Sequence, residues 1–219
     1  MKKHAFTLIE ILVVISIIAI LAAIAIPFVQ STIARGHSAK CMENLRDLGA
    51  QVQSYAKDKG HYPITFNGNT PWEEMGTWSG ITNSSSWLCP ARFLKSGKTS
   101  SQISSFTPAY TANDRVFTRR GVRVDAVPRP SQVIALIDAG QRMPSGTAFH
   151  QMIVTGANNP AHADRPLLGI PITEPNTDIT TRGSVRYRHQ GSANALFCDG
   201  HVESMKLGSI LEKNISINY

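Results

Sequence analysis

The sequence has few cysteines and lacks the signatures of the common catalytic and metal sites. Its three cysteines, Cys41, Cys89 and Cys198, are too few for a disulfide scaffold, and none stands in the paired C-x-x-C spacing of a structural zinc site. The patterns G-x-S-x-G and H-E-x-x-H, a Walker loop and an EF-hand loop are all absent. Three cysteines fit either three buried free thiols or one disulfide with one free thiol. The disulfide is expected only if the domain lies outside the cytoplasm.

The chain also lacks a concentrated basic surface. Its formal net charge of +7 is compatible with nucleic acid or an anionic membrane as a partner. The lysines and arginines are scattered, however, and no continuous basic helix or basic strand with interleaved aromatics stands out. We therefore expect no nucleic-acid partner.

What the sequence does contain is a long apolar run near its start. Residues 11–28 are apolar except for Ser16 and Pro27, and this length suffices for a tilted helix to cross hydrocarbon. Because the run is apolar on all sides, a buried helix of a soluble protein is a poor alternative. A secretory signal peptide is the nearer competitor, but its charged segment would be only Lys2 and Lys3, and no convincing small-x-small cleavage site follows the run.

A helical pattern continues from the apolar run to Lys59. Apolar or small residues recur there every three or four positions with polar residues between them, which predicts one amphipathic stripe. A single helix over residues 6–59 would be roughly 80 Å long, with a stop at Gly60. Pro27 and Gly36 are the expected points of bending or breaking. The stripe consists of Ile33, Met42, Leu45, Leu48, Val52 and Tyr55.

Glu10 places a carboxylate at the head of the apolar run. An ionised carboxylate in or near hydrocarbon is costly, so such a residue usually has a partner. No basic residue lies within a helical turn after it, and we expect the partner to come from elsewhere. A free amine made by cutting the chain just before Glu10 would serve. The alternative is that Glu10 lies at the level of the lipid headgroups.

The stretch AFTLIE (residues 5–10), with a basic leader before it and the apolar run behind it, resembles the amino-terminal signature of type IV prepilins and type II secretion pseudopilins. The resemblance implies cleavage by a prepilin peptidase between Ala5 and Phe6 and methylation of the new Phe6 amine. It also implies that Glu10 pairs with an amino-terminal amine, commonly of a neighbouring subunit, during assembly. Pro27 stands where pilins commonly carry a helix-breaking proline. Ala5 departs from the glycine that the family prefers, which bears on the efficiency of cleavage.

The resemblance further implies an organisation and a location. The expected segments are a leader (1–5), a transmembrane and assembly helix (6–29), its amphipathic continuation (30–60) and a soluble β-rich domain (61–219). The expected location is the inner membrane, crossed once, with the carboxy-terminal domain outside the cytoplasm, and then a pilus or periplasmic pseudopilus. The expected partners are the peptidase, other pilin or pseudopilin subunits, an inner-membrane assembly platform and membrane lipid.

Beyond residue 60 the chain is rich in turn-forming residues and carries short strand-like runs. In 194–207 two alternating runs flank Asp199-Gly200, a pair favoured in two-residue type I′ hairpins because both positions need positive φ. We predict an α+β fold of the type IV pilin kind, with an antiparallel sheet packed on the second half of the helix and with long loops, which include 141–182 around one strand. Further strands are predicted at 115–118, 121–127, 132–138, 151–156 and 184–190, and a final helical turn at 207–213.

A second resemblance concerns the carboxy-terminal half. His189, nine intervening residues and Asp199-Gly200 resemble the H-x9-DG motif of large families of bacterial pilin-like proteins, as do the stretches CMENLRDLG, HYP and LCPA. We expect a structural role, in which Asp199-Gly200 makes the turn and His189 is a strand residue bonded to nearby backbone. A catalytic or metal-binding role for His189, Asp199 and His201 is the minor alternative, because the intervening strand would hold His189 away from the hairpin tip.

No residue pattern assigns a cofactor or a catalytic site. Some secretion pseudopilins bind calcium, and Asp164, Glu174 or Asp178 could contribute oxygens here, although no spacing assigns them. A bridge between Cys41 and Cys89 is compatible with their separation, and it would contribute roughly 2 to 4 kcal/mol of stability.

We therefore predict a non-enzymatic subunit of a type IV pilus or a type II secretion-type filament. One competitor is a membrane-anchored extracytoplasmic binding module that uses the pilin-type leader for export and binds a ligand or cargo through its loops. Loop aromatics could bind a carbohydrate or peptide, although such residues more often cover a small core. A second competitor, ranked last, is an anchored hydrolase that uses His189 and Asp199. The loop aromatics in question are Trp72, Trp78 and Trp87.

Overall fold

The computed structural model of the chain describes residues 7–64, 84–87, 89–93, 109–118, 120–138, 151–152, 164 and 185–217. The chain divides into two compact units, Met1–Gly36 and His37–Tyr219. The elements of the second unit include three short 3-10 helices before and between the strands and one after them. These are η2 (Ser84–Trp87), η3 (Pro90–Phe93), η5 (Val124–Ala126) and η7 (Glu212–Asn214).

The long helix α1 (Leu8–Lys59) belongs to both units. It continues through Pro27 without interruption, so the helix does not break there, while the alternative of a bend at Pro27 stays a prediction. A proline removes one backbone donor and leaves the neighbouring i→i−4 hydrogen bonds in place, and the helix can therefore continue past it. The stop at Gly60 is confirmed. Gly60 has a φ of +75°, which glycine adopts without the steric cost that a side chain would bring.

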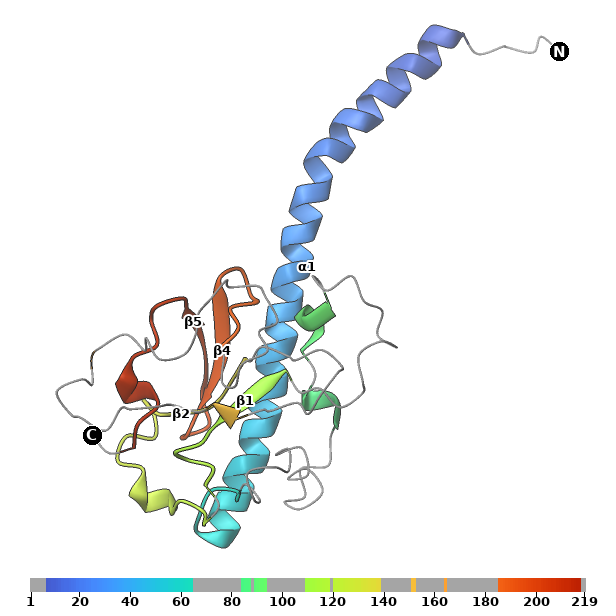
Figure 1. The fold of residues 1–219 in the computed structure, drawn as a ribbon. Helices are drawn as coiled ribbons and strands as arrows, with labels where there is room; N and C mark the ends of the chain where they lie inside the picture. Colours follow the sequence, from blue (N-terminus) through green and yellow to red (C-terminus); the bar gives the residue numbers. More distant parts are fainter. Residues whose placement is uncertain are drawn as a thin grey trace, which may run out of the picture. The chain divides into compact units, whose positions relative to one another are not determined.

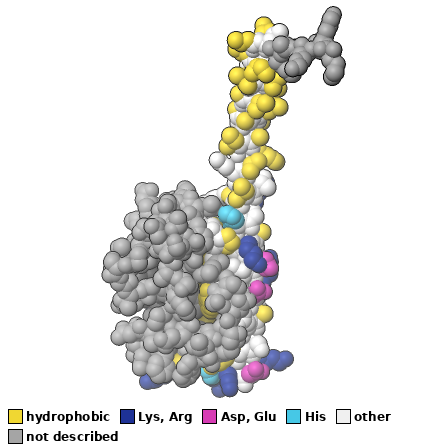
Figure 2. Space-filling view, turned by 90° about the vertical axis from the view of Figure 1, so that its right-hand side faces the viewer, with side chains coloured by type: hydrophobic (Ala, Val, Ile, Leu, Met, Phe, Trp, Pro, Cys, Tyr) yellow, Lys and Arg dark blue, Asp and Glu magenta, His cyan; other side chains and the backbone are white. Residues whose placement is uncertain are grey.

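In the first unit, α1 exposes apolar side chains, and Figure 2 shows them along the side of the helix that faces the viewer. Every valine, leucine, isoleucine and phenylalanine between Leu8 and Val29 exposes at least 50% of its surface. The helix contains an 18-residue window with a mean hydropathy of 3.1. By length and composition it is able to cross a membrane, as the apolar run predicts.

The second unit contains a five-stranded sheet in the order β3-β1-β2-β4-β5 (Figure 1). Four strands form antiparallel neighbours, and the two-residue β3 adds to β1 in parallel. The second half of α1 packs on this sheet, so the predicted α+β fold of the type IV pilin kind is confirmed. The strands are β1 (Tyr110–Asn113), β2 (Ile134–Asp138), β3 (Gln151–Met152), β4 (Ser192–Phe197) and β5 (Val202–Lys206).

The strands β1, β2 and β4 are buried on both faces, whereas most residues of the edge strand β5 are exposed. On one face, Leu136 and Leu196 belong to the same core cluster as the α1 residues Leu45, Leu48 and Val52. On the other face, the neighbouring strand residues Ile137 and Ala195 pack in a second cluster, which also contains Tyr187, Phe197, Met205, Ile210 and Ile215. Two-sided burial explains why all five residues of β2 are buried and why its sequence is a continuous apolar run.

The strand predictions are partly confirmed. The run 132–138 contains β2, the run 194–207 contains β5 and all of β4 except its first two residues, and the start of 151–156 forms β3. The strand predicted at 115–118 is wrong, because a turn follows β1 there. The Asn113 side chain causes this turn: it donates to the carbonyls of Ile134 and Ile215 and accepts from the Arg115 amide, so it takes the place of further ladder bonds.

Two more predicted strands are wrong. Within 121–127 only Arg123 pairs, in an isolated bridge with His61, and η5 follows it. In 185–190 there are only bridge positions, because the chain folds back at once, with the Arg188 amide donating to the Arg186 carbonyl. The strand β1 is absent from the sequence-based prediction. The final helical turn is predicted at 207–213. The structure forms η7 at Glu212–Asn214, which overlaps only the end of that range.

The hairpin between β4 and β5 is confirmed, but its turn is not type I′. Among the described residues only Gln190 combines a side chain with a positive φ, so Asp199 lacks the positive φ that this turn requires. Gly200 alone takes it, at +96°, and the Phe197 amide donates to the His201 carbonyl across the loop. The turn therefore has three residues with glycine in the last position, a common longer hairpin connection.

Candidate functional site

The head of α1 is closed by a reciprocal hydrogen-bond arrangement between Thr7 and Glu10. The Glu10 carboxylate accepts from the Thr7 amide and from the Thr7 hydroxyl, both at 2.8 Å. The Glu10 amide in turn donates to the Thr7 hydroxyl oxygen at 3.3 Å. This is a capping box, which satisfies backbone donors that a helix start otherwise leaves without partners.

The capping box gives Glu10 uncharged hydrogen-bond partners, and the expectation of a positively charged partner from elsewhere stays a prediction. Thr7 is a partner within the same helical turn. The T-x-x-E spacing is itself a sequence signal for such a box, and a search restricted to basic partners misses it. The expected cleavage residues Ala5 and Phe6 lie outside the described residues.

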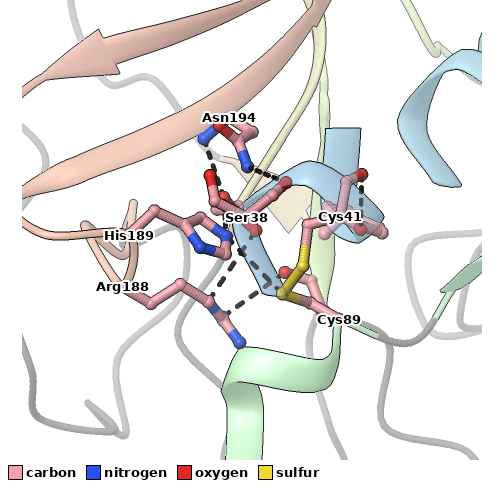
Figure 3. The surroundings of a disulfide bond; sticks show 9 residues. Ser38, Cys41, Cys89, Arg188, His189 and Asn194 are labelled. Carbon is pink, nitrogen blue, oxygen red and sulfur yellow. Dashed lines mark hydrogen bonds and ion pairs between the residues drawn. A yellow bond between two sulfur atoms is a disulfide. The ribbon is translucent and has the colours of Figure 1, made fainter. Parts of the chain in front are cut away.

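In the second unit, a disulfide joins Cys41 of α1 to Cys89, which directly precedes η3 (Figure 3). Both residues have no exposed surface, and their Cα atoms are 5.1 Å apart. Cys198 is the free cysteine of the chain. Burial raises the pKa of the Cys198 thiol to about 12, so this thiol stays protonated near neutral pH.

Beside the disulfide, the Asp138 carboxylate lies at the end of β2 with no exposed surface. Its Oδ2 accepts a hydrogen bond from the backbone amide of Asn194 at 2.7 Å and lies 3.2 Å from His189 Nε2. Its Oδ1 lies 3.7 Å from Arg188 Nε. The same His189 nitrogen lies 3.5 Å from the Cys89 sulfur. A carboxylate, an imidazole, a guanidinium and a disulfide therefore lie together in the interior, and we call this group the Asp138 cluster. Figure 3 labels its members Arg188, His189, Cys41 and Cys89.

The charges of the Asp138 cluster depend on one another because water is excluded. Burial lowers the pKa of Arg188 and lowers that of Arg186 to about 10, while the charge of Asp138 acts in the opposite direction on both. Burial and, after it, the Asp138 charge raise the pKa of the Tyr110 hydroxyl. A buried carboxylate that faces cations in this way is costly to remove, because its partners lose their compensation.

The three residues of the H-x9-DG pattern lie at the two ends of β4. At one end, His189 exchanges two backbone hydrogen bonds of 3.0 Å with Ser192 across Gln190 and Gly191, which both have positive φ. At the other end, Asp199 Oδ1 accepts from the His201 amide at 3.1 Å and lies 2.6 Å from His201 Nδ1. The strand between them is about 20 Å long at about 3.3 Å per residue. His189 and Asp199 therefore do not form a joint site.

The Asp199-Gly200 end of the hairpin lies against α1. The Tyr62 hydroxyl donates a hydrogen bond to the Cys198 carbonyl at 3.0 Å, and the side-chain amide of Gln53 donates to the same oxygen. A Cβ built on Gly200 would lie 3.4 Å from Gln53 Cγ. Glycine here therefore provides both the positive φ and the close approach of the turn to the helix.

The other residues considered as ligand-binding or calcium-binding candidates either pack or form an ion pair within the described part of the fold, or lie outside it. Trp87 exposes 8% of its surface and belongs to the core cluster on α1. Asp164 forms an ion pair with Lys213. Trp72, Trp78, Glu174 and Asp178 lie outside the described residues.

Comparison with known proteins places the head of α1 in a recognised sequence motif. Residues 1–26 match the prokaryotic N-terminal methylation motif. The chain is also 43% identical over 61 residues to the fimbrial protein EcpC of Eikenella corrodens, a match that covers 28% of this chain and 40% of that protein. It is 34% identical over 67 residues to the type II secretion system core protein G of Escherichia coli K12, over 31% of this chain and 46% of that protein.

The chain thus spans less than half the length of each of these relatives. No solved structure matches it. The methylation motif contains both the capping residues Thr7 and Glu10 and almost all of the exposed apolar surface of α1. The matches support a relation to type IV pilins and type II secretion pseudopilins.

Proposed function

We propose that the protein is a structural, non-enzymatic subunit of a type IV pilus or a type II secretion-type filament, assembled through α1. The observation that carries the proposal is the methylation motif at residues 1–26, which covers a helix whose apolar side chains are exposed all round. Packing such helices side by side would remove this surface from water. The relatives, a fimbrial protein and a secretion-system core protein, support the same role.

The proposed maturation follows the methylation motif. Residues 1–5 form a leader that an inner-membrane prepilin peptidase removes by cutting between Ala5 and Phe6, and the new Phe6 amine is methylated. Residues 6–29 span the inner membrane and later form the filament core, while 30–60 and 61–219 form the domain outside the cytoplasm. The proposed partners are other subunits, the assembly platform and membrane lipid.

Glu10 has two successive roles in this proposal. In the single chain, Thr7 holds its carboxylate in the capping box. In the filament, the carboxylate pairs with the amino-terminal amine of a neighbouring subunit, because an unpaired charge would oppose burial of the apolar helices. The pair would set the register between subunits.

The H-x9-DG residues have a structural role in this proposal. His189 contributes to the Asp138 cluster, and Asp199 and Gly200 shape the turn that lies against α1. Since His189 and Asp199 lie at opposite ends of β4, the geometry does not support a hydrolase that uses both.

Maturation is tested by intact mass and amino-terminal sequencing of the protein recovered from its native membrane. We expect a chain that begins at Phe6 and carries a methyl group on its amine. The Ala5→Gly variant, which restores the residue preferred by the family, is expected to be processed at least as completely. A chain that still begins at Met1, or that is cut after the apolar run, would leave an anchored or secreted binding module as the better account.

Assembly is tested with Glu10→Gln, a substitution that keeps a capping side chain and removes the charge. We expect this variant to be inserted and processed but to yield few or no filaments when sheared or crosslinked material is counted. Thr7→Ala removes the hydroxyl of the capping box and keeps the Glu10 charge, so it is expected to assemble far better. If Glu10→Gln assembles like the unaltered chain and Thr7→Ala does not, Glu10 acts as a cap only.

A further inference from the structure

Three potential metal ligands converge on the Asp138 cluster. The Cys41 and Cys89 sulfurs and a His189 ring nitrogen all lie within 4.8 Å of one another, and all three residues are buried. They come from α1, from the segment before η3 and from the turn before β4, and the fold alone brings them together. Two sulfurs and an imidazole are a donor set that zinc prefers.

The distance between the Cys89 sulfur and the His189 ring nitrogen suits a tetrahedral ion, and reduction of the bridge would free the two sulfurs to separate around it. With zinc about 2.3 Å from sulfur and about 2.05 Å from nitrogen, tetrahedral angles place the two ligand atoms about 3.6 Å apart. The distance from Cys89 Sγ to His189 Nε2 is 3.5 Å. Asp138 Oδ2, 3.2 Å from the same nitrogen, is the nearest oxygen for a fourth position.

We propose that the thiol form of this chain binds one zinc ion through Cys41, Cys89 and His189, and that zinc and the disulfide exclude each other. The thiolate is the ligand, whereas a disulfide sulfur carries no charge. Opening the bridge takes two electrons and two protons and yields two thiols. A dithiol supplies both and becomes a disulfide, whereas a phosphine supplies the electron pair, takes the oxygen of a water molecule to become the phosphine oxide, and leaves the two protons of that water on the sulfurs. Zinc binding then releases the two thiol protons.

The charge of the surroundings fits an added dication. Two thiolates and the Asp138 carboxylate would together carry three negative charges at positions without exposed surface. Arg188, whose side chain is 3% exposed and whose Nε lies 3.7 Å from Asp138, supplies one positive charge, and zinc supplies two. Either a disulfide or a zinc ion would therefore crosslink Cys41 of α1 to Cys89. The zinc ion would also link these two cysteines to His189. This inference does not depend on the filament role.

The test is a Co²⁺ titration of the full-length protein in mild detergent, without oxygen, after reduction by a phosphine. We expect one Co²⁺ per chain, a thiolate-to-cobalt absorption band, visible bands of tetrahedral intensity, and displacement of cobalt by zinc. The unreduced protein is expected to show none of these signals. Cys198→Ala and His201→Ala, which change a cysteine and a histidine outside the cluster, are expected to titrate like the unaltered chain.

The ligands are assigned with Cys41→Ala, Cys89→Ala and His189→Ala. We expect the cysteine variants to lose the tetrahedral spectrum, and His189→Ala to bind more weakly by at least the roughly 10- to 100-fold that loss of an outer-shell partner costs. The proposal is overturned if the reduced, folded protein binds no Co²⁺, if His189→Ala binds unchanged, or if Cys198→Ala abolishes binding. Should a variant fail to fold, X-ray absorption of the zinc-loaded unaltered chain decides: two sulfur ligands with nitrogen or oxygen support the site, and any other set refutes it.

Discussion

Replacement of Asp138 by alanine is expected to lower the free energy of unfolding of the oxidised protein by about 3–5 kcal/mol, the range found when one partner of a buried charge pair is removed. The Asn194 amide loses an acceptor at 2.7 Å, and His189 Nε2 loses a carboxylate oxygen at 3.2 Å. Arg188, whose side chain is 3% exposed, loses its nearby negative charge. The measurement is denaturant unfolding of the full-length protein in mild detergent, followed by near-ultraviolet circular dichroism.

Two further variants separate the causes of this loss. Asp138→Asn keeps a side-chain oxygen for the Asn194 amide and removes only the charge, so its loss is expected to be smaller than that of Asp138→Ala. Asp125→Ala also removes a carboxylate from an arginine, but the Arg123–Asp125 pair is exposed, with side chains 76% and 67% accessible. Its effect is expected to be far smaller. Equal losses in Asp138→Ala and Asp125→Ala would contradict the argument from burial.

Removal of the Cys41–Cys89 bridge is expected to lower the same free energy by about 4 kcal/mol, because the bridge closes a long loop and so restricts the unfolded chain. The two cysteines are separated by 48 positions in the sequence. The double variant Cys41→Ala/Cys89→Ala is compared with the unaltered oxidised chain by the same unfolding measurement, with a metal chelator present throughout.

Cys198→Ala is the matched control for the bridge. It removes one buried sulfur without opening a disulfide, so we expect a loss well below that of the double variant. A double variant whose midpoint equals that of Cys198→Ala would show that restriction of the unfolded chain contributes little. The slope of the free energy against denaturant concentration is also informative. It should rise in the double variant, because an unbridged chain exposes more surface when it unfolds.

The long helix and the hairpin were predictable because their signals are local. A continuous apolar run, a stripe repeated every three or four residues and a glycine at position 60 define α1 almost to its last residue. The alternating runs around Asp199-Gly200 define β4 and β5. The turn type was wrong, because the pair Asp-Gly fits several hairpin turns, and the register of the strands decides among them.

The strands at 115–118 and 121–127 were wrong for a different reason. Both runs contain strand-forming residues, but within 121–127 only Arg123 pairs, in an isolated bridge with His61. At 115–118 the Asn113 side chain bonds to the Ile134 and Ile215 carbonyls and turns the chain. Those carbonyls belong to segments 21 and 102 positions away. A local pattern carries no information about partners at such distances, so propensity was overridden by tertiary contacts.

The sequence by itself determined the helix, its apolar surface, the methylation motif and the position of the main hairpin. Each of these depends on neighbouring residues or on composition. Only the tertiary structure decided that Cys41, Cys89, Asp138 and His189 form one cluster, since the Cys89–His189 contact spans 100 positions and the Asn194–Asp138 contact spans 56. Their approach follows from the order of the strands and from burial of the central strands on both faces, which places a carboxylate, an imidazole and two sulfurs away from the molecular surface.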